Sequence, residues 1–316
     1  TQFFGVVKDA LKLKRLTDAD AKQLRGLVQA AHDAPEGWQK QRAIARVLTF
    51  QEHLKGEMGW KDVPMAVWYA NVFSSPATHA ANVIGNTFKA MEVLGIEILK
   101  RPIAAPQILR AFARGAEKGG LEAANVLRTG QVEGTRLLKA EAARPLEWRV
   151  QQGGWNKVFT PWAMVGRLLA AEDVLPFKAH EEIRWMLQAR RVAKSEGLIG
   201  EALDKRVNEL LHNTDAAWQA AKAQAATEGL KGMDLQRRAH ELIEQQREAS
   251  MPGSTELARN YGLEHTFNAE PYGVAGAIAE VLNYANQKLV VTRFAVPVVR
   301  IVANLTNESL NYFPPA

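Results

Sequence analysis

The chain has 316 residues, of which 47% are hydrophobic, 23% charged and 8% aromatic. This apolar content is enough for a sizeable core and excludes a wholly disordered chain. Cysteine is absent, which excludes disulfide scaffolds, cysteine nucleophiles and thiolate metal sites. Because the chain starts at Thr1 rather than Met, we expect it to be part of a larger polypeptide.

The N-terminal segment, residues 1–63, is predicted to be helical. Thr17 is a typical N-cap residue, because Asp20 stands three positions later and completes a capping box. Apolar residues then follow at helical spacing, at Leu24, Leu27 and Ala31. A second helix is expected over about residues 38–56.

The next segment, residues 64–152, contains a helix that Pro76 is expected to begin. Its apolar residues repeat at steps of three and four, as in an amphipathic helix: Ala80, Ile84, Phe88, Met91 and Ile98. Pro102 and Pro106 separate this helix from the basic helices that follow.

Positive charge is concentrated in residues 97–167, which hold twelve basic and six acidic residues and so account for the whole chain's net charge of +6. Arg110, Arg114 and Lys118 are four residues apart, which predicts that they share one helix face. Such a stripe can contact the phosphates of nucleic acid or of anionic lipid. The alternative is an ordinary solvated helix face, because no aromatic residues are interleaved for base stacking.

The third segment, residues 153–252, begins at Gly153 and Gly154 and is predicted to be a charged helical bundle. Pro176 is expected to break or kink the helix that follows Pro161. Candidate helix ends within this segment are Gly197, Gly200, Gly229 and Gly232.

The last segment, residues 253–316, is predicted to contain a loop up to about residue 272 and a final helix over 274–311. Residues 289–305 are strongly apolar, but Arg293 and Arg300 make a membrane-spanning helix unfavourable. A buried core helix, an amphipathic helix on a bilayer and a helix at a subunit interface all fit this pattern. We predict an interface with a second copy of the chain, through Val290, Phe294, Val298, Ile301 and Leu305.

These patterns predict an all-α fold, an elongated multi-helix bundle, because no segment shows the alternation and turn signals of a strand.

The candidate catalytic groups in the sequence are weak. His240 and Glu244 offer only two metal ligands, and Glu172 and Asp173 are adjacent, so they point about 100° apart on a helix. Glu308 lacks the glycine-rich segment that follows the catalytic Glu-Ser pair of lytic transglycosylases. We therefore expect no enzyme activity, metal or cofactor.

Three blocks of sequence carry a resemblance. Residues 68–87 read WYANVFSSPATHAANVIGNT, residues 159–178 contain FTPW, AED and FK, and residues 294–304 read FAVPVVRIVAN. In this order the blocks resemble the bacteriophage internal virion (ejection) proteins and the related large polyvalent phage proteins. Ser75 and Val298 depart from that pattern, which usually has Gly and Phe there.

The resemblance implies a non-enzymatic virion protein that oligomerises and helps to deliver or channel phage DNA into the host. Its partners would be further copies, other virion proteins, DNA and the periphery of a membrane, in the virion and then in the host envelope or cytoplasm. An alternative is a nucleic-acid-handling domain of a polyvalent protein in the host cytoplasm, and a cell-wall hydrolase is a third class. The motif residues are expected to be structural. Pro76 would start a helix, and Thr78 would bind the free backbone amides of that helix start. Asn82 and Asn86 would link packed helices.

Overall fold

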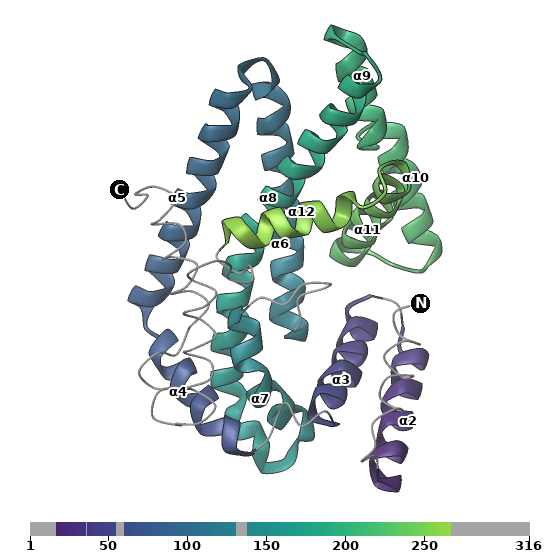
Figure 1. The fold of residues 1–316 in the computed structure, drawn as a ribbon. Helices are drawn as coiled ribbons and strands as arrows, with labels where there is room; N and C mark the ends of the chain where they lie inside the picture. The colour runs from purple at the N-terminus through teal and green to yellow at the C-terminus, as the bar shows by residue number, and fades with distance from the viewer. Residues whose placement is uncertain (1–16, 36, 55–59, 131–137, 267–316) are drawn as a thin grey trace. The chain divides into compact units, whose positions relative to one another are not determined.

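The computed structural model describes residues 17–35, 37–54, 60–130 and 138–266 (Figure 1). Within these ranges the regular structure is entirely helical, which confirms the all-α, multi-helix prediction. The elements are α2 (Asp18–Asp33), α3 (Trp38–Leu54), η1 (Trp60–Asp62), α4 (Val63–Phe73), α5 (Pro76–Lys100), η2 (Pro102–Ala104), α6 (Ala105–Thr129), α7 (Leu138–Gln152), η3 (Gly154–Phe159), α8 (Thr160–Ser195), α9 (Gly200–Leu210), α10 (Asp215–Thr227), α11 (Gly232–Ser250) and α12 (Ser254–His265).

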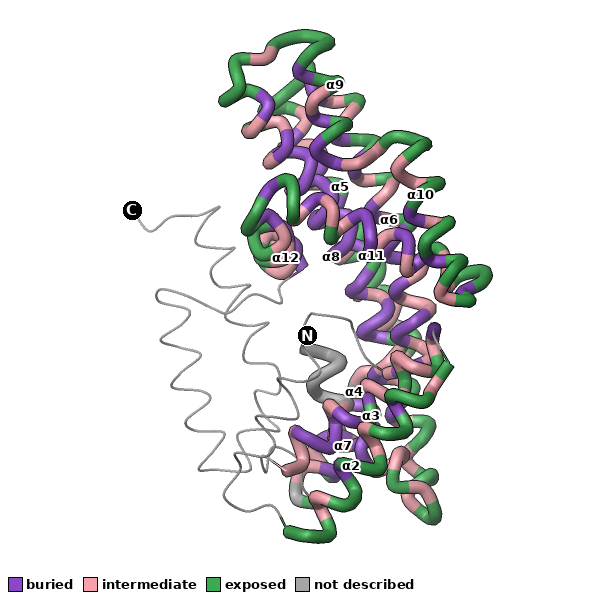
Figure 2. The backbone as a smooth tube through the Cα atoms, turned by 90° about the vertical axis from the view of Figure 1, so that its right-hand side faces the viewer, coloured by how far each residue is buried: buried purple, intermediate pink, exposed green. Residues whose placement is uncertain are grey.

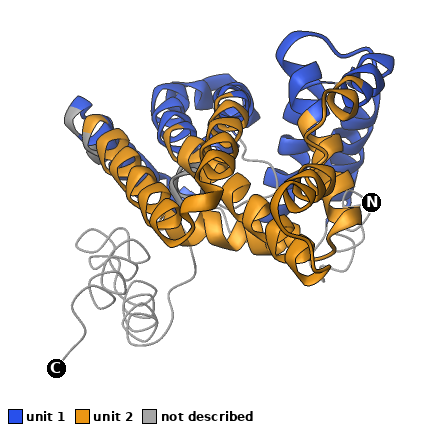
Figure 3. Cartoon of the chain, turned by 90° about the horizontal axis from the view of Figure 1, so that it is seen from above, with its two compact units in different colours: residues 1–79, 121–171, 220–239 blue, residues 80–120, 172–219, 240–316 orange. Residues whose placement is uncertain are grey.

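Contacts group the chain into two compact units (Figure 3). Unit 1 contains residues 1–79, 121–171 and 220–239, and unit 2 contains residues 80–120, 172–219 and 240–316. Each unit combines stretches that are far apart in the sequence, whereas the predicted division was into the four consecutive segments 1–63, 64–152, 153–252 and 253–316. Composition along a chain does not reveal such a discontinuous grouping, because it arises from helix packing.

Unit 1 has two apolar clusters. The first joins α2, α3 and α7 through Leu24, Ala31, Val47, Phe50 and Trp148. The second joins α4, α7 and α8 through Val63, Ala66, Ala70, Leu146 and Ala163. Helix α2 begins at the predicted capping box, in which Asp20 donates its backbone N–H to the Thr17 hydroxyl at 3.2 Å and the Thr17 N–H donates to the Asp20 carboxylate at 3.2 Å.

Unit 2 has a larger core, and its most continuously buried stretch lies in α8 between residues 177 and 189 (Figure 2). Side chains from α5, α6, α9 and α12 complete this core, among them Leu94, Ile108, Val207 and Ala258. Pro176 does not end α8, which continues to Ser195, so of the predicted break or kink the break does not occur. A proline costs the helix one backbone hydrogen bond, and the buried side chains of Val174 and Phe177 on either side favour its continuation.

Two glycines on α6 allow it to approach α8 closely within unit 2. A Cβ atom on Gly115 would lie 2.5 Å from the Cα of Ala179 and 2.5 Å from the carbonyl oxygen of Lys178. A Cβ atom on Gly119 would lie 2.7 Å from the Cα of Leu175. Because the two glycines are four residues apart, they lie on the same face of α6 and bring the two backbones together.

Helix α12 occupies residues that were predicted to be a loop. Its first turn is capped by a side chain from the preceding helix: the Glu248 carboxylate accepts the backbone N–H of Gly253 at 2.6 Å and of Thr255 at 2.8 Å. Gly253 has φ of 81°, a left-handed conformation that suits glycine. The N-cap residue, Gly253, has no side chain with which to cap the helix, and the cap comes from Glu248 of α11 instead.

Candidate functional site

The predicted basic stripe on α6 does not form one exposed face. Arg110 is exposed, Arg114 is half-buried and Lys118 is buried. Residues four apart in an α-helix are rotated by about 40° from one another, so Lys118 is turned by about 80° from Arg110. This rotation carries the stripe from the solvent into the interior of unit 2, where Lys118 meets carboxylates rather than an external phosphate.

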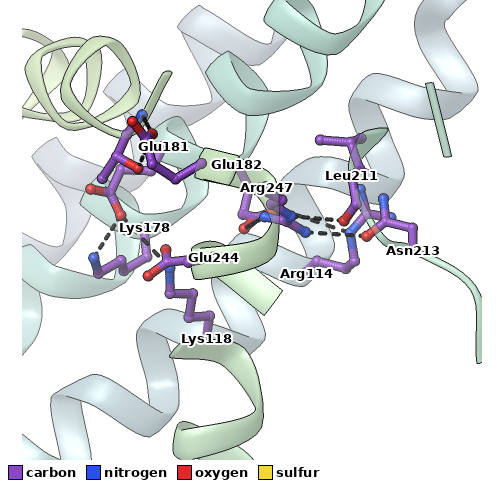
Figure 4. A network of polar contacts seen from close by, with 11 residues as sticks. Arg114, Lys118, Lys178, Glu181, Glu182, Leu211, Asn213, Glu244 and Arg247 are labelled. Atoms are coloured by element: carbon purple, nitrogen blue, oxygen red, sulfur yellow. Dashed lines mark hydrogen bonds and ion pairs between the residues drawn. The ribbon is translucent and has the colours of Figure 1, made fainter. Parts of the chain in front are cut away.

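Lys118 and its neighbours form an ionic network that links α6, α8 and α11 within unit 2 (Figure 4). The Lys118 ammonium donates a hydrogen bond to the Glu244 carboxylate and lies 4.0 Å from the Glu181 carboxylate. Glu181 also accepts a hydrogen bond of 2.6 Å from Lys178. His240, which was paired with Glu244 as a weak candidate metal site, packs against Trp218 instead. The centroids of the two rings are 4.6 Å apart.

Arg247 of α11 forms the second half of this network. Its Nη1 donates to the Glu182 carboxylate at 2.5 Å, its Nε to the Leu211 carbonyl at 2.8 Å and its Nη2 to the Asn213 side-chain oxygen at 3.1 Å. Arg114 is a further cation next to this pair, and its Nε lies 3.9 Å from the Glu182 carboxylate. The Arg247–Glu182 pair therefore ties α8 to α11 and to the end of α9 in the core of unit 2.

The network holds four cationic side chains against three carboxylates, an excess of one positive charge. Burial alone would raise the pKa of Glu182, but Arg247, Lys118 and Arg114 outweigh it and lower that pKa to about 2. Burial, together with the neighbouring Lys178, lowers the pKa of Lys118 to about 8. Glu182 is thus firmly ionised, whereas the buried lysine holds its proton less tightly than an exposed one.

The sequence analysis assigned no role to Glu182 or Arg247, although one signal was available. Along α8, four of the six residues that lie three, four and seven positions from Glu182 are apolar and buried: Ala179, Trp185, Met186 and Ala189. A carboxylate in the middle of such a face needs a buried cation, because an isolated buried charge is very unfavourable. Arg247, with Ile243 as its neighbour one helical turn earlier, was a suitable partner.

The asparagines of the first resemblance block link α5 to α8 within unit 2. The Asn82 amide donates to the Glu172 carboxylate at 2.7 Å and to Asp173 at 3.3 Å, and the Asn86 amide donates to Asp173 at 2.9 Å. Both acids therefore bind helix-linking amides. Pro76 begins α5, and the backbone N–H of Thr78 donates to the Ser75 carbonyl in the first turn.

A third polar group in unit 2 surrounds His180. This side chain is fully buried, and neither of its ring nitrogens has a hydrogen-bond partner among the described residues. The ring centroids of Tyr261 and His265 lie 6.4 and 5.4 Å from the ring centroid of His180. Burial, with added repulsion from His265 and Lys89, lowers the pKa of His180 to about 3. The imidazole is therefore neutral in the folded chain.

His180 gives a prediction about pH. The ordinary pKa of histidine is 6.5, and the folded value is about 3, so the folded state loses stability as pH falls from 6.5 towards 3. The slope approaches about 1.4 kcal/mol per pH unit. In urea denaturation between pH 7 and pH 5, His180→Leu should show a weaker decrease in stability than the wild type. Parallel curves for the two proteins would contradict the neutral, buried imidazole.

Neither a metal site nor a membrane span is found in the described part of the chain. No group of three or more His, Asp or Glu side chains in these ranges is placed to hold a metal ion. No helix in them combines the length and the apolar character needed to cross a bilayer. The predicted interface residues Val290, Phe294, Val298, Ile301 and Leu305 lie outside the described residues.

The chain matches no protein-family model, no curated protein and no solved structure. Its candidate sites are therefore defined by their own residues: the ionic network, the asparagine links, the His180 group and the arginines on α6.

Proposed function

We propose that this chain is a non-enzymatic, virion-associated helical protein of a bacteriophage, which assembles with further copies and helps to deliver or channel phage DNA into the host. It would reside in the virion with other virion proteins, and after infection in the host cell envelope, at the periphery of the membrane, or in the cytoplasm. The proposal is supported by the three sequence blocks and by the all-α fold. The single observation that carries its assembly step is an exposed apolar face of α5.

The apolar stripe of α5 consists of Ile84, Phe88, Met91 and Leu99, whose exposed fractions are 68%, 73%, 57% and 82%. The spacing predicted an amphipathic helix, but α5 buries its opposite side, including Ala90, Val93 and Leu94. Single exposed apolar residues are ordinary, whereas several large ones on the same face of one helix mark an interaction surface.

We assign a second copy of the same chain as the partner of this stripe. The chain itself carries a strongly apolar stretch over 289–305, which was predicted to lie at a subunit interface. A second copy supplies that stretch and a second α5 stripe together, at equal concentration.

Replacing Phe88 with Asp tests this assembly. The variant should raise the dissociation constant of the oligomer by about thirtyfold or more, because a central interface residue contributes about 2 kcal/mol. Light scattering after gel filtration measures the mass, and circular dichroism should show unchanged helix content because Phe88 is exposed.

Ile199→Asp is the matched control, since Ile199 is an isolated apolar residue with 83% exposure in the same unit. It should leave the oligomer intact. A wild-type chain that remains monomeric at every concentration, or equal effects of the two variants, would contradict the assembly. A ring of copies in electron micrographs would favour the virion role.

The alternative, a nucleic-acid-handling domain that acts in the host cytoplasm, is favoured by one observation. Arg110 is exposed and, within the described residues, forms no ion pair or hydrogen bond that would compete with a phosphate. In that case the chain should bind DNA as a monomer, and Phe88→Asp should leave the affinity for DNA unchanged.

A further inference from the structure

A pocket of about 240 Å³ opens on unit 2 between α6 and α9. Arg110 and Arg114 of α6 line one side, and Asp204 and Asn208 of α9 line the other. Met186 of α8 also lines the pocket. All of these residues belong to unit 2, and the pocket reaches the outer edge of the buried ionic network through Arg114.

Among the described residues, neither arginine in this pocket has a hydrogen-bond partner. Arg110 forms no ion pair or hydrogen bond within the described part of the chain. The Arg114 guanidinium donates no hydrogen bond in that part either, and its Nε is buried. The carboxylate nearest to Arg114 belongs to Glu182, at 3.9 Å, and Glu182 is already bound by Arg247 at 2.5 Å. A guanidinium carries five N–H donors, so leaving them unsatisfied in a mostly buried position is unfavourable.

The acid in the pocket does not supply the missing partner. Asp204 accepts a hydrogen bond from the Gln107 amide at 2.8 Å and one from Arg190 at 3.4 Å, so its charge is compensated from outside the arginine pair. Asn208 is exposed, and its side-chain amide forms no hydrogen bond with the described residues. Within the described part of the chain, the pocket therefore presents two guanidinium groups and one amide that form no hydrogen bond with protein atoms.

We propose that this pocket binds a phosphoryl group, held by Arg110 and Arg114 with Asn208 as a neutral donor. Guanidinium groups match the oxygens of phosphate with paired hydrogen bonds. The excess positive charge of the adjacent network favours an anion, and repulsion from Arg247 and Arg110 adds to the burial that lowers the pKa of Arg114. An anion would relieve both the missing hydrogen bonds and this repulsion.

The volume of the pocket exceeds that of a bare phosphate, so the group can be a phosphate monoester or a backbone phosphate of nucleic acid. This phosphoryl site is separate from the proposed self-assembly and does not depend on it. Only the inference that the site binds nucleic acid rests on the proposed function.

Isothermal titration calorimetry with inorganic phosphate, and separately with a short single-stranded DNA at the same ionic strength, tests the site. Wild-type protein should bind phosphate saturably, and Arg110→Gln should weaken binding about tenfold or more, because hydrogen bonds to charged groups are strong. Arg191→Gln is the matched control, since Arg191 is an exposed arginine of unit 2 without a described partner. It should leave phosphate affinity unchanged.

Arg114→Gln removes the second guanidinium, and its fold is checked by circular dichroism because Arg114 lies near Glu182. Should that variant unfold, Arg110→Gln alone decides. Absence of saturable phosphate binding, or equal weakening by Arg110→Gln and Arg191→Gln, overturns the site. If phosphate binding depends on Arg110 but DNA binding responds equally to both variants or is absent, the phosphoryl site stands and the DNA role in the proposed function falls.

Discussion

Replacing Gly115 with Ala should destabilise unit 2 by about 3 kcal/mol, although alanine is the better helix former. The new methyl group would lie 2.5 Å from two backbone atoms of α8, the Cα of Ala179 and the carbonyl oxygen of Lys178. Backbone atoms cannot rotate away as a flexible side chain can. The two helices would have to separate, and the apolar contacts between them would weaken.

Gly120→Ala is a stringent control on the same helix. A Cβ atom on Gly120 meets nothing within 4 Å, so this substitution should stabilise the protein by up to about 1 kcal/mol through helix propensity alone. Urea denaturation followed by circular dichroism measures both variants against the wild type. Similar effects of the two substitutions would show that α6 and α8 do not approach as closely as Gly115 requires.

Local signals in the sequence predicted much of the secondary structure. The capping box of Thr17 and Asp20 begins α2, and Pro76 begins α5. Glycines at positive φ follow or begin helices at Gly197 and Gly232. These signals succeed because each acts on a backbone group within four residues of itself.

Features that depend on distant residues could not be predicted in this way. The cap of α12 is Glu248, a side chain of the preceding helix that no motif marks. The face of α5 with large apolar residues is exposed, whereas the opposite face is buried. Lys118 continued a basic stripe in the sequence, yet its partner Glu244 is 126 residues away. The charge pattern identifies candidate cations, but the packing of helices decides which of them remain available to a ligand.

The buried pair of Arg247 and Glu182 should be the most sensitive ionic contact of unit 2. Arg247→Met should cost about 3–5 kcal/mol, because it leaves a buried carboxylate without its closest cation and leaves the Leu211 carbonyl without its donor. Adding Glu182→Leu should recover most of that loss, since an apolar pair of similar volume is often as stable as a buried ion pair.

Arg206→Met provides the matched control. Arg206, like Arg247, binds a carboxylate: two of its nitrogens lie 2.8 and 3.0 Å from Glu196. Both of these side chains, however, are more than a third exposed. Surface pairs of this kind contribute about 1 kcal/mol or less. Equal costs for Arg206→Met and Arg247→Met would contradict the burial of the Arg247 pair.

The dependence on pH separates the loss of this ion pair from a simple loss of packing. The pKa of Glu182 is about 2 in the folded chain and 4.5 ordinarily, so the stabilisation is fully present above pH 4.5 and is lost as pH falls towards 2. Arg247→Met removes the largest of the causes that lower this pKa, so the folded-state pKa of Glu182 rises, and protonation then relieves the buried charge. The unfolded pKa of Glu182 is the same in both proteins, so the difference in unfolding free energy between wild type and Arg247→Met should narrow as pH falls from the raised folded-state pKa of the variant towards 2. If this difference in unfolding free energy stays constant down to the acid transition, the cost of Arg247→Met comes from the cavity that the substitution leaves. The network would then stabilise unit 2 through packing rather than through charge pairing.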